Sequence, residues 1–406
     1  GTVRAQLGIN MTGKSFPNPW IVVDIKQKDG EDCLRHLPYF SFICDPECPT
    51  VSCRQPYGHH RFEFMLMPGQ TKEHMEKPET IRAYLSKYVD VSKVEILRSL
   101  VYTFNALVAE KWRDGRVFLA GDAAHMTPQF VGQGMNAGVR DAYNLAWKLD
   151  AALKGQADDR LLDSYQSERR PHAKAMIDLS IHMKNFVSTS NPLLGVLRNV
   201  ATRTARRTPG LREFLSEAKF KPRPRYEAGA YFGLPRQRRN GLEGEQLPQP
   251  TLADRECRPL LLDEALGDGY ALIGFAVDPR QSLSAADLQQ LAQLNTRYLT
   301  LYPAGGRPQG KAAASTPAGL SEWEDMSGEC IRRFRETGYA EGAVAIVRPD
   351  RFVFAMARPG NAPAAVQSLL EQLGLQAVTR QQGASWATPR KLQPPPQRWP
   401  PRVPHK

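Results

Sequence analysis

The sequence lacks any apolar run long enough to cross a membrane. No stretch of its 406 residues approaches the roughly 18–20 consecutive apolar residues that a transmembrane helix needs. The first residues, Gly1-Thr-Val-Arg-Ala, also lack the hydrophobic segment of a secretory signal. With 41% hydrophobic and 24% charged residues, the composition is that of an ordinary globular protein, and we expect a cytoplasmic location.

Cysteines are few, and no two of them have the Cys-x-x-Cys spacing. Of the six cysteines, only Cys44, Cys48 and Cys53 lie close together, and Pro46 and Pro49 interrupt them. Zinc sites and thiol redox pairs typically use two cysteines separated by two residues. The spacing therefore predicts reduced structural thiols, no metal site and no thiol redox activity.

Acidic residues are scarce in two segments, which carry the whole net charge of +12. Residues 198–240 contain twelve Lys or Arg against three Glu, and residues 390–406 contain five basic residues and no acid. Aromatic residues are not interleaved with these basic ones, as a base-stacking platform for nucleic acid would require. We therefore predict a solvated Arg-rich surface. Nucleic-acid binding is the alternative, and it predicts a steep salt-dependent retention on DNA.

The most informative stretch runs from Arg116 to Asn136. Its apolar run Val117–Ala120 has the length of a buried strand and ends at Gly121-Asp122, where the chain must turn and expose a carboxylate. The pair Gly132-Gln-Gly134 then opens a helical pattern that stops at Gly155. The sequence predicts a strand, a loop containing a proline and a long helix.

This pattern suits a ligand that carries hydroxyl groups and a delocalised negative charge. The free N–H groups of Gly134, Met135 and Asn136 would form a helix N-terminus with its partial positive charge. Gly132 and Gly134 have no Cβ, so a flat ring could approach the backbone closely. Asp122 could accept hydrogen bonds from sugar or ribityl hydroxyls.

Two other interpretations compete with this one. Residues 132–137 formally match the dinucleotide fingerprint G-x-G-x-x-[GA], but that motif should follow its strand immediately. Here the segment Asp122–Val131, which contains Pro128, intervenes. The second interpretation is a glycine-rich turn before a core helix, with Asp122 as a turn cap.

Residues 121–149 resemble the second FAD motif of the single-component, FAD-dependent aromatic-ring hydroxylases. The segments that carry the resemblance are Gly121–His125, Pro128, Gly132–Asn136, Asp141–Leu149, Arg61–Gly69, Tyr165–Ala173 and Ile346–Asp350. The resemblance extends from residue 1 to about residue 380 and implies a flavoprotein monooxygenase. It implies FAD as cofactor, NADH or NADPH as electron donor, and O2 and a small phenolic compound as substrates.

The resemblance also implies which residues bind the cofactor: Arg116, Leu119, Ala120, Gly121, Asp122, Ala123, Ala124, His125, Pro128, Gly132, Gly134, Met135 and Asn136. Asp122 would anchor the ribityl chain, and the N–H groups of Met135 and Asn136 would stabilise negative charge on the reduced flavin. Pro128 would shape the loop under the ring. His125 is more often a packing histidine than a base, and no catalytic base is identified.

The fold implied by the resemblance is α/β and α+β. It combines an incomplete p-hydroxybenzoate-hydroxylase-like FAD fold, with an antiparallel substrate sheet, and a C-terminal thioredoxin-like α/β domain. The predicted divisions are a partial FAD and substrate domain at 1–189 (sheet 17–107, flavin motif and helices 108–189), a basic connector at 190–249, the thioredoxin-like domain at 250–382 and a disordered Pro/Arg tail at 383–406. Family members begin with a strand–GxGxxG–helix and a later Asp-Gly-x-x-Ser-x-Val-Arg motif, of which Thr2-Val3-Arg4 resembles only the end.

Local patterns predict the individual elements. We expect strands at 20–24, 40–44, 51–54, 61–67, 94–107, 260–262, 270–275, 296–302, 343–347 and 352–357. We expect helices at 78–88, from Asp158 or Asp159 to about 181 with a kink at Pro171, at 285–294 and at 364–373. In the strand 61–67, Phe62 and Phe64 should face one side and Glu63 the other.

The resemblance favours 3-(3-hydroxyphenyl)propanoate or 3-hydroxycinnamate, hydroxylated at ring position 2, as the substrate. The carboxylate would need a cationic partner, for which Arg54, Arg61 and His60 are candidates because they flank the predicted sheet. Another phenol is the nearest alternative, and a homo-oligomer is compatible with the resemblance. A further alternative is an inactive fragment without the ADP-binding half of the FAD site, or one that receives this half from another chain.

Overall fold

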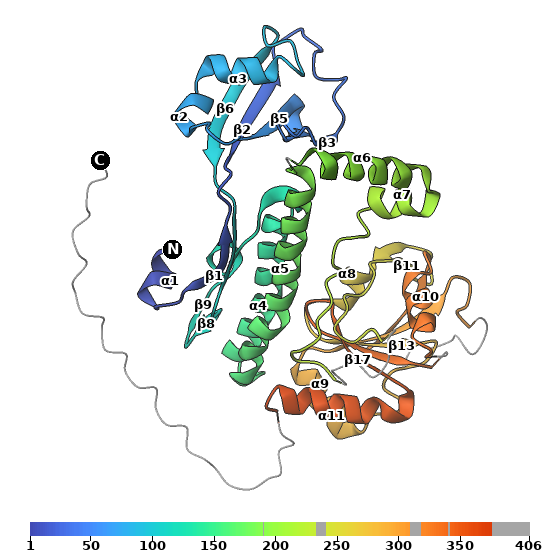
Figure 1. Cartoon of the computed structure of the whole chain (residues 1–406). Helices are drawn as coiled ribbons and strands as arrows, with labels where there is room; N and C mark the ends of the chain where they lie inside the picture. Colours follow the sequence, from blue (N-terminus) through green and yellow to red (C-terminus); the bar gives the residue numbers. More distant parts are fainter. Residues whose placement is uncertain (190, 233–240, 309–317, 340–341, 376–406) are drawn as a thin grey trace. The chain divides into compact units, whose positions relative to one another are not determined.

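A computed structural model describes residues 1–189, 191–232, 241–308, 318–339 and 342–375 (Figure 1). Residues 1–375 form one compact unit. The predicted division of these residues into domains stays a prediction, and the predicted tail at 383–406 lies outside the described residues. Among the described residues, no helix combines the length and the apolar character that a membrane span requires.

A five-stranded antiparallel sheet forms from the first third of the chain. Its strand order is β3-β4-β5-β2-β6. The strands are β2 (Trp20–Gln27), β3 (Phe40–Ile43), β4 (Thr50–Arg54), β5 (His59–Met65) and β6 (Val94–Tyr102). Helices α2 (Lys72–Met75) and α3 (Pro78–Leu85) follow β5, and α3 begins at a proline, which suits a first helical position.

The two faces of this sheet have different neighbours. Phe62 and Phe64 pack in one core with Ile81 and Leu85 of α3. Met65, on the other face of β5, packs in a separate core with Trp20. The alternation predicted for this strand is therefore confirmed, although both faces are buried.

A layer of two long helices comes next in the chain. The helices α4 (Gly134–Leu153) and α5 (Arg160–Val187) lie side by side (Figure 1). Gly155 has φ +70° directly after α4, as expected of a glycine that ends a helix. α5 continues through Pro171. Shorter elements complete this part: α1 (Thr2–Gln6), β1 (Met11–Ser15), β7 (Asn105–Ala109), β8 (Arg113–Asp114), β9 (Val117–Phe118) and β10 (His125–Met126).

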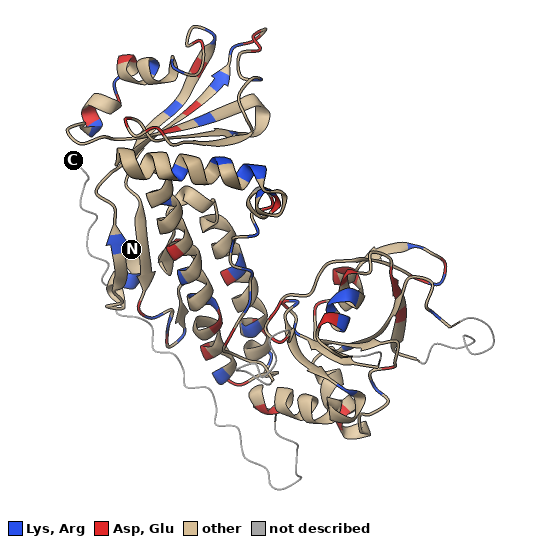
Figure 2. Cartoon of the chain, turned by 45° about the vertical axis from the view of Figure 1, so that its right-hand side comes forward, with Lys and Arg blue, Asp and Glu red and all other residues tan. Residues whose placement is uncertain are grey.

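The segment predicted as a basic connector contains two helices, α6 (Pro192–Arg207) and α7 (Pro209–Ser216). The side chain of Asn191 caps α6 by accepting hydrogen bonds from the N–H groups of Leu193 and Leu194. Figure 2 shows Lys and Arg residues along α6 and along strands of the five-stranded sheet.

The last third of the described chain forms a seven-stranded sheet with order β12-β11-β15-β14-β13-β16-β17. β13 and β14 pair in parallel, as do β14 and β15, whereas β16 and β17 are antiparallel additions. This is the thioredoxin-like α/β arrangement that the resemblance implied. The strands are β11 (Thr251–Ala253), β12 (Pro259–Leu261), β13 (Ala271–Phe275), β14 (Arg297–Pro303), β15 (Leu320–Asp325), β16 (Val344–Val347) and β17 (Val353–Ala357), and the helices are α8 (Leu262–Leu266), α9 (Ala285–Gln293), α10 (Glu329–Glu336) and α11 (Ala362–Gln372).

A buried ionic cluster joins α4 and α5 to this sheet. Glu168 accepts hydrogen bonds from Lys148 at 2.8 Å and from both terminal nitrogens of Arg348 at 2.9 Å. Arg348 also donates to Asp350, and Asn144 donates to both Glu168 and Asp350. Each of the five is at most 1% exposed. Burial would raise the pKa of Glu168, but the positive charges of Arg348 and Lys148 hold that pKa well below its ordinary value.

Candidate functional site

One cavity of about 630 Å³ lies between the five-stranded sheet and the segment from Gly121 to Gly138. Asp122 and Met135, which the sequence predicts on either side of one ligand, both line it. So do Gly121, Gly132 and Gly134 of the predicted residues. The central expectation, a shared hollow for the aspartate and the start of the helix, is met by this geometry.

Two glycines hold Asp122 close to α4. A Cβ added to Gly138 would lie 3.3 Å from the Cα of Gly121, so the turn and the helix pack backbone to backbone. Gly121 has φ +56°, a value that favours glycine. Asp141 also fixes the turn, because its Oδ2 accepts the N–H of Gly121 at 3.0 Å.

Asp141 is the centre of a buried support beneath this wall of the cavity. It contacts the Nε2 of His125 at 2.7 Å and accepts a hydrogen bond from the Nε of Arg169 at 2.9 Å. Burial would raise its pKa, but the hydrogen bond with His125 and the charge of Arg169 leave the pKa of Asp141 below its ordinary value. His125 is 1% exposed and stacks on Trp112, so it supports the turn from within the core.

The first turn of α4 presents backbone N–H groups that its N-cap side chain does not satisfy. Gln133 is the N-cap, and its side chain makes no capping hydrogen bond. Gly132 precedes it with φ +61°. A Cβ at Gly132 would meet nothing within 4 Å, and Met135 is 80% exposed. An anionic or dipolar ligand edge can therefore reach these N–H groups and the positive end of a twenty-residue helix.

The facing wall is the sheet, whose register sorts its residues into rows. Trp20 of β2 pairs with Met65 of β5 and Tyr102 of β6. Two residues along β2, Val22 pairs with Glu63 and Leu100, and two further on, Asp24 pairs with Arg61 and Arg98. Directly opposed residues share a face, so this face changes from aromatic through mixed to charged along the strands.

Glu63 is the one acid in the middle row. It is 6% exposed, and the side-chain amide of Gln129 donates a hydrogen bond to it. Burial raises the pKa of Glu63 to about 7, against the opposing effects of the Arg61 charge and the Gln129 hydrogen bond. Gln129 itself lines the cavity.

Residues 1–180 match the family described as FAD binding domain, and residues 244–372 match the HcaD C-terminal domain. The chain is 38% identical over 376 residues to a 3-(3-hydroxy-phenyl)propionate/3-hydroxycinnamic acid hydroxylase of Klebsiella pneumoniae (strain 342), covering 92% of this chain and 65% of that protein. A protein of the same name from Escherichia coli (strain K12) is 39% identical over 358 residues, covering 88% and 62%.

The chain is thus similar to these hydroxylases over most of its length, and its first 180 residues match an FAD binding domain.

Solved structures agree with this at the level of the fold. The chain is similar to aklavinone-11 hydroxylase in complex with FAD and aklavinone, with a TM-score of 0.65 at 21% identity over 92% of this chain and 65% of that one. It is similar to the flavin-dependent monooxygenase PieE in complex with FAD and substrate, with a TM-score of 0.67 at 21% identity, over 92% and 68%. The chain spans slightly less than two thirds of the length of the two hydroxylases from Klebsiella and Escherichia.

The residues present fit the FAD that the two solved structures contain. The cavity offers Asp122 as an acceptor and the first N–H groups of α4 as donors on one wall. The hydroxyl of Thr127, a lining residue, is buried and has no hydrogen-bond partner among the described residues. An unpaired buried hydroxyl is costly, so a bound group that pairs with it would be favoured.

Several predicted residues do not line this cavity. Leu119 and Ala124 are buried in the core, and Arg116 is exposed in the turn between β8 and β9. The carbonyl of Pro128 accepts a hydrogen bond from Ser180. The roles of all these residues toward FAD, with those of Ala120, Ala123, His125 and Asn136, stay predictions.

Sequence reasoning missed Thr127, Gln129, Arg98, Tyr102 and Phe104, all of which line the cavity. Only Gln129 carried a usable signal, as a polar residue directly after the proline of the flavin loop. Of the cations proposed for the substrate, Arg61 lines this cavity. The other two, Arg54 and His60, line a separate depression of about 200 Å³.

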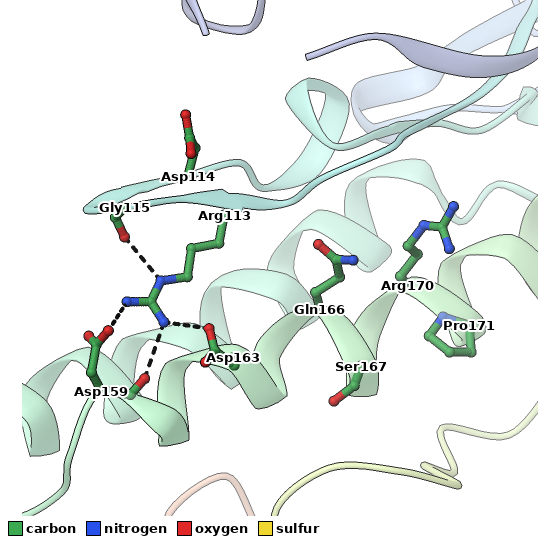
Figure 3. Close-up of a pocket in the computed structure, with 9 residues that line it drawn as sticks. All are labelled: Arg113, Asp114, Gly115, Asp159, Asp163, Gln166, Ser167, Arg170 and Pro171. Carbon is green, nitrogen blue, oxygen red and sulfur yellow. Dashed lines mark hydrogen bonds and ion pairs between the residues drawn. The ribbon is translucent and has the colours of Figure 1, made fainter. Parts of the chain in front are cut away.

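A further hollow, between the β8–β9 hairpin and α5, is occupied by protein charges (Figure 3). Arg113 enters it and binds the carboxylates of Asp159 and Asp163 and the carbonyl of Gly115. These contacts already use its guanidinium. This hollow therefore leaves fewer unpaired polar groups for a ligand than the cavity lined by Asp122 and Met135 does.

Proposed function

We propose that this chain forms the flavin-facing and substrate-facing walls of a monooxygenase that hydroxylates a phenolic ring. The proposed substrate is 3-(3-hydroxyphenyl)propanoate or 3-hydroxycinnamate, with hydroxylation at ring position 2. The proposed electron donor is NADH or NADPH, and the proposed location is the cytoplasm. One observation carries the proposal, namely that five of the predicted flavin residues, Asp122 and Met135 among them, line the same cavity as residues of an aromatic-to-basic sheet face.

Each wall has a distinct task in this proposal. Asp122 accepts hydrogen bonds from the ribityl hydroxyls, and the N–H groups at the start of α4 stabilise negative charge on the pyrimidine edge. Such pre-organised donors contribute about 3–4 kcal/mol each in sites that exclude water. When bound, FAD would pass electrons from the nicotinamide donor to O2 and so supply the activation of O2 on which the hydroxylation depends.

The sheet orients the aromatic substrate and keeps water away from it. Trp20, Phe104 and Phe130 form an aromatic group with ring centroids 5.3–6.2 Å apart, and Phe104 of this group lines the cavity. Each of the three is at most 4% exposed, so a buried apolar layer lies behind the cavity wall at Phe104. In this proposal a phenolic ring lies over the middle row of the sheet, next to this aromatic group, and the side-chain amide of Gln129, which lines the cavity, meets its hydroxyl.

The proposal is tested by adding FAD, FMN or riboflavin to the purified chain and recording flavin fluorescence. All three carry the ribityl chain and the ring that Asp122 and α4 are proposed to contact, so all three should be quenched. Riboflavin binding without FAD binding would still support the site. Unchanged fluorescence of all three flavins would contradict it. A panel of phenols with and without a carboxylate then separates the proposed substrate from another phenol.

A further inference from the structure

Two arginines of the sheet lie opposite the same aspartate in the strand register. In the strand register, Asp24 of β2 lies directly opposite Arg61 of β5 and also directly opposite Arg98 of β6. Because opposed residues in an antiparallel sheet point to the same side, the three side chains start from one row of one face. Arg61 and Arg98 both line the cavity.

The aspartate is committed to one of the two arginines. The Nε of Arg61 donates to Oδ1 of Asp24 at 2.7 Å, and its Nη2 donates to Oδ2 at 3.0 Å. This is a bidentate pair that uses both oxygens. Arg98 forms no ion pair and no side-chain hydrogen bond with any residue that the structure describes. The cavity wall therefore carries one guanidinium without a counter-ion.

The other charges near this row do not balance Arg98. Glu63 lies one row further toward the aromatic end, and its carboxyl is buried against Gln129. Asp122 belongs to the opposite wall, where the flavin is proposed to bind. None of these carboxylates forms an ion pair with Arg98 in the described part of the chain, so the carboxylate of a ligand can pair with it.

The distance between rows fits an aromatic acid. Successive rows of one face are two residues apart, which is about 7 Å along a strand. A phenolic ring over the middle row would thus bring a short carboxylate-bearing side chain to the row of Arg98. The aromatic row of Trp20 and Tyr102 lies at the other end.

We propose that Arg98 binds the carboxylate of the aromatic substrate and selects anionic phenols over neutral ones. The inference rests on the proposed function and adds a specificity-determining residue to it. Arg61 is the less suitable of the two because a substrate would have to displace Asp24. Arg54 and His60 line a different depression and do not meet this ligand.

Equilibrium dialysis of the full chain with two ligands tests the proposal. The ligands are 3-(3-hydroxyphenyl)propanoate and 3-propylphenol, which have similar shapes but differ in charge. We expect Arg98→Gln to weaken binding of the acid roughly tenfold and to leave binding of 3-propylphenol unchanged. Arg98→Lys should recover part of the loss. Arg82→Gln is the matched control, because Arg82 is exposed on α3, which packs on the opposite face of the sheet.

Each other outcome overturns the proposal in a distinguishable way. If Arg98→Gln changes the affinity for both ligands equally, or for neither, the carboxylate does not bind there although the proposed function stands. If only Arg61→Gln lowers the affinity for the acid, the carboxylate binds Arg61. If neither ligand binds the unmodified chain, the proposed substrate class falls together with the role of Arg98.

Discussion

The helices α4 and α5 contribute to two polar sites that differ in how completely their groups are paired. Toward the seven-stranded sheet, Lys148 and Glu168 are closed inside a cluster with Arg348 and Asp350. At the other site, the start of α4 and the Arg98 side chain face a cavity without such partners. The difference teaches that paired buried charges hold a fold together, whereas the unpaired groups are available for a ligand.

The largest expected effect comes from opening the closed cluster. Glu168→Gln would leave Lys148 buried without its carboxylate partner and Arg348 with Asp350 alone, and we expect a loss of about 3–5 kcal/mol in the free energy of unfolding. Urea denaturation measures this. Glu79→Gln, at an exposed position of α3, is the control and should leave the midpoint unchanged. A loss below about 1 kcal/mol in Glu168→Gln would show that the cluster contributes little.

The next effect concerns Glu63, a buried acid in the middle row of the five-stranded sheet. Its folded-state pKa of about 7 lies above the ordinary 4.5, so the folded chain holds the proton more tightly than the unfolded chain. The contribution of Glu63 to stability is therefore fully present below pH 4.5 and is lost as the pH rises to about 7. The shift corresponds to about 3 kcal/mol.

Comparison of the unmodified chain with Glu63→Gln isolates the part of the pH dependence of the free energy of unfolding that comes from Glu63. The buried His60 and His172 have pKa values lowered to about 4, mainly by burial, and they reduce stability as the pH falls below 6.5. These histidines remain in the variant, so the difference between the two stability curves belongs to Glu63. Parallel curves between pH 4.5 and 7 would contradict the assignment.

A smaller effect is expected where the open site is altered. Asp122→Ala removes an acceptor that no described residue uses as a cap, and we expect flavin affinity to fall roughly tenfold with unchanged stability. Flavin fluorescence titration measures the affinity. Asp114→Ala, in the exposed hairpin of β8 and β9, is the matched control. An equal loss in both variants would indicate a general charge effect.

The smallest effect is expected at the hollow of Figure 3. Asp163 is 71% exposed, and Arg113 keeps Asp159 as a partner when Asp163 is removed. Asp163→Asn should therefore cost less than about 1 kcal/mol in urea denaturation. A cost equal to that of Glu168→Gln would erase the distinction between exposed and buried pairs.

The sequence predicted elements best where a single residue pattern decides them. The apolar run that begins at Trp20 gave β2, and the glycine pair gave the start of α4. The polar strand β15 was missed because its burial depends on neighbours far away in the chain. Leu262, predicted at the end of a strand, instead begins α8. The predicted strand at 117–120 is shorter, since β9 ends at Phe118.

The residues of the candidate site also divide into those that a local sequence pattern predicted and those that it could not predict. Asp122 and Met135 lie within one local motif, so sequence spacing alone brought them together. Arg98 could not be found, because whether an arginine is paired depends on strand register and not on its neighbours in sequence. The segments Tyr165–Ala173 and Ile346–Asp350 carried the family resemblance, but only the structure shows that both enter the closed cluster.

The closed cluster limits how freely the C-terminal region could be exchanged during evolution. Glu168 and Arg348 are 180 residues apart in sequence, yet each neutralises the other. A recombined chain whose C-terminal region came from a distant relative would fold well only if it brought an arginine and an acid to the same two places. An α/β region that replaces this one must therefore supply counterparts of Arg348 and Asp350 to pair with the buried charges of α4 and α5.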